Sequence, residues 1–127
     1  MIAVDTSALM AIILGEPTSE ACIAALAAED DILISAGTVA EALIVAAGRG
    51  VSAEMVKLID ETGIEIVAVT PAAALRIGRV HQQWGRGFHQ AALNFGDCFA
   101  YEVAKEHACP LLYVGDDFSK TDIARVL

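Results

Sequence analysis

The sequence predicts an α/β fold built on a parallel sheet. Short apolar segments of strand length alternate with longer helical segments along the 127 residues, a pattern typical of strands joined by crossover helices. The chain has the size of one common domain. No apolar run reaches the roughly 18–20 residues of a membrane-spanning helix, and the N-terminus lacks the positive charges of a secretory signal. We expect a single soluble, cytoplasmic domain over residues 1–127 that has no membrane partner.

Turn and cap residues divide the first half of the chain into two strands and four helices. Thr6 or Ser7 can cap the first helix, and Gly15 can end it in a left-handed turn. The glycines of Gly48-Arg49-Gly50 end the third helix. The expected elements, in order, are a strand at Ile2–Val4, helices through Leu14 and over about Thr18–Ala28, a strand at Ile32–Ser35, and helices over about Thr38–Ala47 and Ala53–Glu61.

The second half of the chain continues the alternation. Ile64–Val69 is rich in β-branched residues and predicts a strand. Thr70-Pro71 begins a helix in the manner that proline favours, and the glycines of Gly85–Gly87 interrupt it. A further helix is expected over Phe95–His107, and a buried strand over Leu111–Val114.

The charge distribution bears on the class of partner. The net charge is −9, which disfavours nucleic-acid binding over the whole surface because lysine and arginine drive contacts to phosphate. However, residues 70–96 contain no acidic residue and form a basic stretch with Arg76, Arg79, His81, Arg86 and His89. The three cysteines are odd in number and show no CxxC spacing. We therefore expect reduced core thiols rather than disulfides or a zinc site.

Four acidic residues are candidates for a functional site in an α/β fold. Asp5 and Asp116 directly follow the first and last strands, at the sheet edge where such folds bind ligands. Glu41 is the only ionisable residue of Gly37–Ala47, and a buried carboxylate needs a partner or a metal ion. Asp97 opens a helix. Each acid also has an ordinary explanation: a helix cap, a turn, an exposed helical strip or a favourable helix dipole.

If these four carboxylates lie close together, they determine which chemistry the site can perform. They supply the hard oxygen ligands that Mg²⁺ and Mn²⁺ prefer. Such ions can activate water and stabilise the departing oxygen in phosphodiester hydrolysis. A phosphatase with two aspartates spaced as DxD is disfavoured, because Ser7 lies two residues after Asp5.

Four motifs follow one another along the chain: Ile2–Leu9, a glutamate at position 41, Leu93–Cys98, and Gly115–Phe118 with Thr121-Asp122. Together they resemble the PIN-domain VapC toxins of VapBC toxin–antitoxin systems. The resemblance covers essentially the whole chain. It implies a three-layer α/β/α sandwich with a central parallel sheet. It also implies an Mg²⁺-dependent endoribonuclease, with Mn²⁺ able to substitute, and a VapB-type antitoxin as partner. A homodimer within a larger toxin–antitoxin assembly is expected as well.

The resemblance also assigns roles to the acids. Asp5 and Asp97 would be the principal metal ligands, Glu41 a further acid in the same site, and Asp116 the fourth. Asp117 is the alternative for the fourth position, and Asp116 is preferred because it follows the strand more closely. In relatives a proline often follows the histidine that occupies position 89, where this chain has Gln90. We expect that difference to alter the loop and leave the acids in place.

For several features, the sequence leaves two interpretations open. Thr6 or Ser7 could add a hydroxyl to the acidic site or only cap a helix. The basic stretch could bind RNA phosphates or solvate the outer face of a helix. Trp84 and Phe88 could stack on bases or pack in the core or a dimer interface. The alternative function is a catalytically silent PIN-fold module that binds RNA or protein. Loss of the acids would mark such a module, and all four are present.

Overall fold

The computed structural model describes residues 1–127 and contains a four-stranded parallel sheet. The strands lie in the order β3-β2-β1-β4. In β1, one of the two inner strands, Ala3 pairs with Leu33 on one side and with Leu111 on the other. The predicted α/β class and parallel sheet are confirmed. The strands are β1 (Ile2–Val4), β2 (Ile32–Ser35), β3 (Glu65–Val67) and β4 (Leu111–Leu112).

All expected helices are present, and their ends differ from the expected ones by at most two residues. They are α1 (Thr6–Leu14), α2 (Ser19–Ala27), α3 (Ala36–Gly48), α4 (Ser52–Thr62), α5 (Pro71–Trp84) and α6 (Phe95–Glu106). No single helix is long and apolar enough to cross a membrane, and only the bent pair α1 and α2 reaches that length and hydropathy together.

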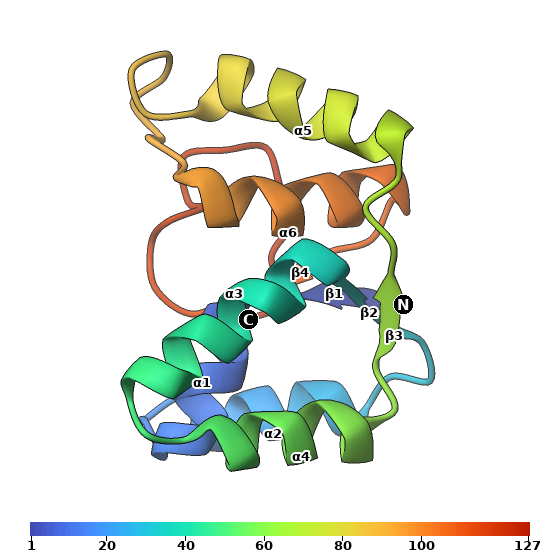
Figure 1. The fold of residues 1–127 in the computed structure, drawn as a ribbon, viewed down its shortest axis with the longest axis vertical. Helices are drawn as coiled ribbons and strands as arrows, with labels where there is room; N and C mark the ends of the chain where they lie inside the picture. The colour runs from blue at the N-terminus through green and yellow to red at the C-terminus, as the bar shows by residue number, and fades with distance from the viewer.

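Alternating side chains of the strands divide the core into two halves. Ile2 and Val4 pack in one buried cluster with residues of α1 to α4. Ala3 and Leu111 pack in a second cluster with residues of α5 and α6. Figure 1 shows α1, α2 and α4 on one side of the sheet and α5 and α6 on the other. The three-layer sandwich is confirmed. The three cysteines are unpaired and buried, as expected.

The two strands in the second half are shorter than expected. β3 covers only Glu65–Val67 and is largely exposed, because it is an edge strand with β2 as its one neighbour. The strand expected over Ile64–Val69 was too long, and its β-branched composition did not show that it lies at the edge of the sheet, because such residues are common in edge and central strands. β4 ends before Val114, whose backbone N–H donates to Ser7 Oγ at 3.0 Å. At that point the chain leaves the sheet and becomes part of the site described below.

Two helix starts also differ from the expected ones. The cap of α1 is Asp5, whose Oδ2 accepts a hydrogen bond from the backbone N–H of Ser7. Neither Thr6 nor Ser7 serves as the cap. α3 begins at Ala36 because Ser35 caps it directly from the end of β2. The left-handed Gly15 and the Thr70-Pro71 start are as predicted.

Candidate active site

The predicted acids gather at the carboxyl edge of the sheet, where the strand order reverses. From β1 the chain moves outward to β2 and β3, and then returns to place β4 on the other side of β1. Ligands bind at such reversals because adjacent connections leave in opposite directions and open a crevice. Asp5 follows β1 at this edge, and residues 115–117 follow β4. Glu41 comes from α3 and Asp97 from the first turn of α6.

Asp5 is a buried carboxylate of which one oxygen is held and the other is free. Its side-chain Oδ2 accepts hydrogen bonds from the backbone N–H of Ser7 at 3.0 Å and from Ser7 Oγ at 2.6 Å. Its Oδ1 is buried and has no hydrogen-bond partner. Burial raises the pKa of Asp5 to about 6, while the bonds from Ser7 oppose that rise. The charges of Glu41 and Asp117 raise the pKa further.

Asp97 is held at the start of α6 by a reciprocal cap. Its Oδ2 accepts from the backbone N–H of Asn94 at 3.0 Å, and its own N–H donates to Asn94 Oδ1 at 2.8 Å. Burial raises the pKa of Asp97 to about 7, and the bond from Asn94 opposes the rise. The nearby charges that raise this pKa are Asp5, Asp117 and Glu41. Four carboxyl groups from distant parts of the chain therefore share one electrostatic environment.

Glu41 joins the site through Thr6. The Thr6 hydroxyl donates to Glu41 Oε1 at 2.6 Å, linking α1 to α3. The apolar neighbours of Glu41 on its helix do not enclose it, because Ile44 is 74% exposed and Val45 40% exposed. Of the two interpretations that the sequence left open for this helix, a buried carboxylate or an exposed helical strip, the exposure of Ile44 and Val45 agrees with the exposed strip. Glu41 is half-buried, between an exposed apolar face and the acidic site.

The electrostatics favour Asp117 over Asp116 as the fourth acid. The charge of Asp117 is among the main causes that raise the pKa of both Asp5 and Asp97, and the charge of Asp116 is not among them. The backbone carbonyl of Asp116 instead accepts from the N–H and Oγ of Ser119, as in an ordinary turn. The chain turns after β4, so proximity in sequence to the strand end does not decide which carboxylate faces the site.

Two supporting residues were missed or undervalued at the level of sequence. Ser7 was considered mainly as a helix cap, but its Oγ donates to Asp5 and accepts from the N–H of Val114, so it fixes the two strand ends together. Asn94 was not singled out, although an acceptor three residues before an acid is the pattern of a reciprocal helix cap.

The donor set suits a divalent cation. Asp5 has a buried carboxylate oxygen without a donor, and Asp97 lies in the same negative field. A cation would favour the charged form of both groups. No three His, Cys, Asp or Glu side chains are arranged as a complete ligand set. Mg²⁺ does not require one, because it commonly takes one or two carboxylates together with water and phosphate oxygens.

The basic stretch divides into a structural part and an exposed part. Arg76 Nε lies 3.2 Å from the buried Glu102 and 3.3 Å from Glu106, so it stabilises the packing of α5 on α6. Arg79 and Arg86 are exposed. Trp84 packs in the second core cluster and donates to Tyr101 Oη at 3.0 Å. Phe88 is 65% exposed.

Comparison with known proteins decides the family. The model of the PIN domain family matches residues 2–124. Ribonuclease VapC36 of Mycobacterium tuberculosis is 43% identical over 124 residues, which cover 94% of this chain and 89% of that protein. The chain belongs to the PIN-domain family of VapC ribonucleases. Ribonuclease VapC30 of the same species is 38% identical over 97% of this chain and 96% of its own length.

Solved structures agree with this assignment at the level of the PIN fold. VapC20 of M. tuberculosis, described as a toxin that cleaves the sarcin–ricin loop, has a TM-score of 0.79 at 16% identity, over 99% of this chain and 98% of its own. A toxin–antitoxin complex from Klebsiella pneumoniae has a TM-score of 0.71 at 19% identity, over 96% of this chain and 93% of its own. The prediction of a PIN-domain endoribonuclease toxin is confirmed at the level of the family.

Proposed function

We propose that the chain hydrolyses RNA phosphodiester bonds in the cytoplasm, in an Mg²⁺-dependent reaction for which Mn²⁺ can substitute. Asp5 and Asp97 would hold the metal, with Glu41 and Asp117 as further acids. We assign Asp117 in place of the Asp116 preferred from the sequence. The observation that carries the proposal is the pair of buried carboxylates, Asp5 and Asp97, at the carboxyl edge of the sheet, one with a buried oxygen free of hydrogen bonds.

The residues of the chain prepare this site in distinct ways. Ser7 holds Oδ2 of Asp5 and leaves Oδ1 available to a ligand. Asn94 fixes the carboxylate of Asp97 against the start of α6. When bound, a divalent cation would supply activation of water and neutralisation of phosphate charge. Glu41 or Asp117 would then accept the proton that the attacking water loses.

The test compares carboxylates of the site with a carboxylate elsewhere. Cleavage of RNA should stop in chelator, return with Mg²⁺ or Mn²⁺, and fall by orders of magnitude in Asp5→Asn and Asp97→Asn. Asp60→Asn on the exposed face of α4 is the matched control and should retain activity. Full cleavage in chelator would refute the metal mechanism. Metal-responsive RNA binding without cleavage in the wild type would favour the silent module instead.

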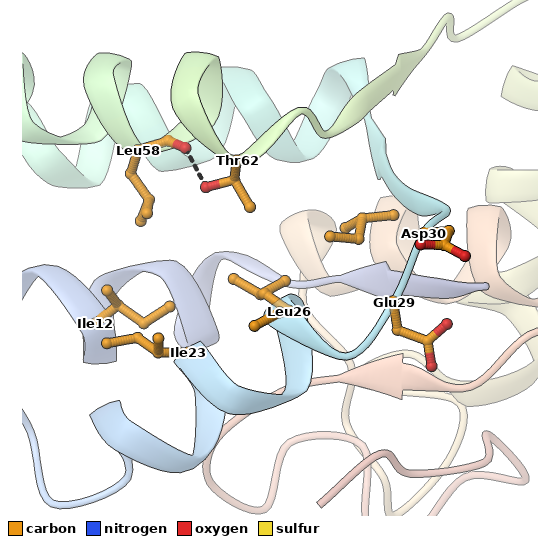
Figure 2. A pocket seen from close by; sticks show the side chains of 9 residues that line it. Ile12, Ile23, Leu26, Glu29, Asp30, Leu58 and Thr62 are labelled. Carbon is orange, nitrogen blue, oxygen red and sulfur yellow. Dashed lines mark hydrogen bonds between the residues drawn. The ribbon is translucent and has the colours of Figure 1, made fainter.

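A groove on the opposite side of the sheet from α5 and α6 is our proposed docking site for a VapB-type antitoxin. The groove has a volume of about 410 Å³ and lies between α1, α2 and α4. Figure 2 shows Ile12, Ile23 and Leu26 facing Leu58 of α4, with Glu29 and Asp30 at one end. An apolar segment ending in a lysine or arginine would match this surface. The toxin–antitoxin complex from K. pneumoniae supports a partner of this class for the fold.

The antitoxin proposal predicts a separation of binding from catalysis. Ile23 is 49% exposed in the groove, so Ile23→Glu should fold normally and keep its RNA cleavage. The same variant should fail to co-purify with the product of a neighbouring antitoxin gene. If Ile23→Glu binds the antitoxin as tightly as the wild type, the antitoxin does not occupy this groove.

A second exposed apolar surface supports the expected homodimer. Ile44 and Val45 of α3 and Phe95 and Phe99 of α6 line a groove beside Glu41. Ile44 is 74% exposed and Phe95 76% exposed, and contiguous apolar surface of this kind marks protein interfaces. We propose that a second copy of the chain covers it. Ile44→Lys should convert a dimer to a monomer in light scattering, whereas an unchanged mass would place the interface elsewhere.

A further inference from the structure

Gly96 lies directly before Asp97 in the first turn of α6 and contacts another acid of the site. A Cβ built on Gly96 would lie 1.6 Å from Glu41 Oε2 and 2.5 Å from the carboxyl carbon of Glu41. The Glu41 carboxylate therefore occupies the space that a side chain at position 96 would need. Gly96 is itself buried.

Local backbone conformation does not explain this glycine. The backbone φ angle of Gly96 is not positive, and alanine is a better helix former than glycine. Gly78 in the middle of α5 offers a comparison, because nothing lies within 4 Å of a Cβ built there. A side chain at position 96 would thus have to displace the Glu41 carboxylate, whereas one at position 78 would displace nothing.

We propose that Gly96 is a positioning residue that admits Glu41 to the active site. Glu41 would then be held between two helices other than its own: Oε1 accepts from Thr6 of α1, and Oε2 rests against the first turn of α6. Negative charge is favoured near the N-terminus of a helix, which offsets part of the repulsion from Asp97. This inference rests on the proposed nuclease function.

The flexibility of the Glu41 side chain allows a positioning role of Gly96 to be distinguished from a simple packing role. The atom that a new Cβ would meet is the end of a long, half-buried side chain, which can swing into solvent. Gly96→Ala should therefore fold, with a melting temperature close to that of the wild type. What it should lose is the placement of the Glu41 carboxylate.

The experiment is a double-mutant cycle of Gly96→Ala and Glu41→Ala, with Gly78→Ala as the matched control. Gly96→Ala should lower kcat for RNA cleavage about 10- to 100-fold, the usual effect of disturbing the support of a metal site. The KM for RNA should change by less than about threefold, because a carboxylate does not attract RNA phosphates. In the Glu41→Ala background, Gly96→Ala should have no further effect on kcat, and Gly78→Ala should behave as the wild type.

A second readout does not depend on activity. In chelator, Gly96→Ala should change the melting temperature more favourably in the Glu41→Ala background than in the wild type, because only the wild type contains the clash. Equal temperature shifts in both backgrounds, or losses of kcat that multiply, would overturn the proposal. Full activity of Glu41→Ala alongside inactive Asp5→Asn would also overturn it and leave the nuclease function intact. Full activity of Asp5→Asn and Asp97→Asn would instead refute the proposed function.

Discussion

Replacement of Asp97 by asparagine should stabilise the metal-free protein at neutral and alkaline pH. Burial raises the pKa of Asp97 from 3.8 to about 7, and the charge of Asp5 adds to that rise. The ionised carboxylate is thus disfavoured in the folded state. Asparagine removes the charge and keeps an oxygen that can accept the N–H of Asn94, so the helix cap survives.

The sign of the pH dependence follows from proton binding. Between pH 4 and 7 the folded state binds more protons at Asp97 than the unfolded state, so the free energy of unfolding falls as pH rises through this window. A shift of about 3 pKa units corresponds to at most about 4 kcal/mol above pH 7. Because solvent screens part of this effect, we expect about 2 kcal/mol, which is about 8 °C in melting temperature for a chain of this size.

The assay is thermal unfolding followed by circular dichroism from pH 5 to 8.5 in chelator. Asp97→Asn should melt about 8 °C above the wild type at pH 8 and approach it at pH 5. The exposed Asp60→Asn should follow the wild type throughout. Added Mg²⁺ should raise the melting temperature of the wild type and not that of Asp97→Asn. A variant that melts at or below the wild type at pH 8 would show that this carboxylate serves folding and would refute the reasoning.

Three further outcomes follow from the contacts of the site and of the basic stretch. Arg76→Ala should reduce stability by about 1–3 kcal/mol in chemical denaturation, because it strips a buried glutamate of its partner; an unchanged midpoint would contradict this. Arg79→Ala and Arg86→Ala should leave stability intact but weaken RNA binding, and each should reduce the slope of its salt dependence by about one unit. A slope equal to that of the wild type would show that these arginines only solvate the helix face. Ser7→Ala should raise the pKa of Asp5 further, since the bonds from Ser7 lower it. The acidic limb of the pH–rate profile should then move to higher pH, and an unmoved limb would show that Asp5 does not control it.

The sequence was sufficient to predict the fold class, the parallel sheet and every helix, because each of these depends on local signals. Gly15 and Thr70-Pro71 lie at helix ends for reasons that hold within one turn of the chain. Edge and central strands could not be told apart in the same way. The exposure of β3 depends on which strand lies beside it, and β-branched residues are common in both positions.

The candidate site was predictable where an acid directly follows or begins an element, as Asp5 and Asp97 do. The choice between Asp116 and Asp117 was not, because it depends on the turn after β4 and not on distance along the chain. The part played by Ser7 was equally hidden. Its contact with Val114 joins residues 107 positions apart, and no local sequence pattern predicts such a contact.

The same carboxylates that suit the site to a cation also oppose folding in its absence. A ligand that binds only the folded state at about 100 times its Kd adds about 2.7 kcal/mol to stability, close to the 2 kcal/mol or so that we assign to the burial of the Asp97 charge among other carboxylates. Stability of the protein should therefore rise with the concentration of metal. A guanidinium can satisfy carboxylates in a similar way, because its planar fork binds two oxygens with a fixed charge. An antitoxin that placed an arginine among these acids would thus stabilise the toxin while displacing the ion on which we propose that its activity depends, and excess Mg²⁺ should oppose that inhibition.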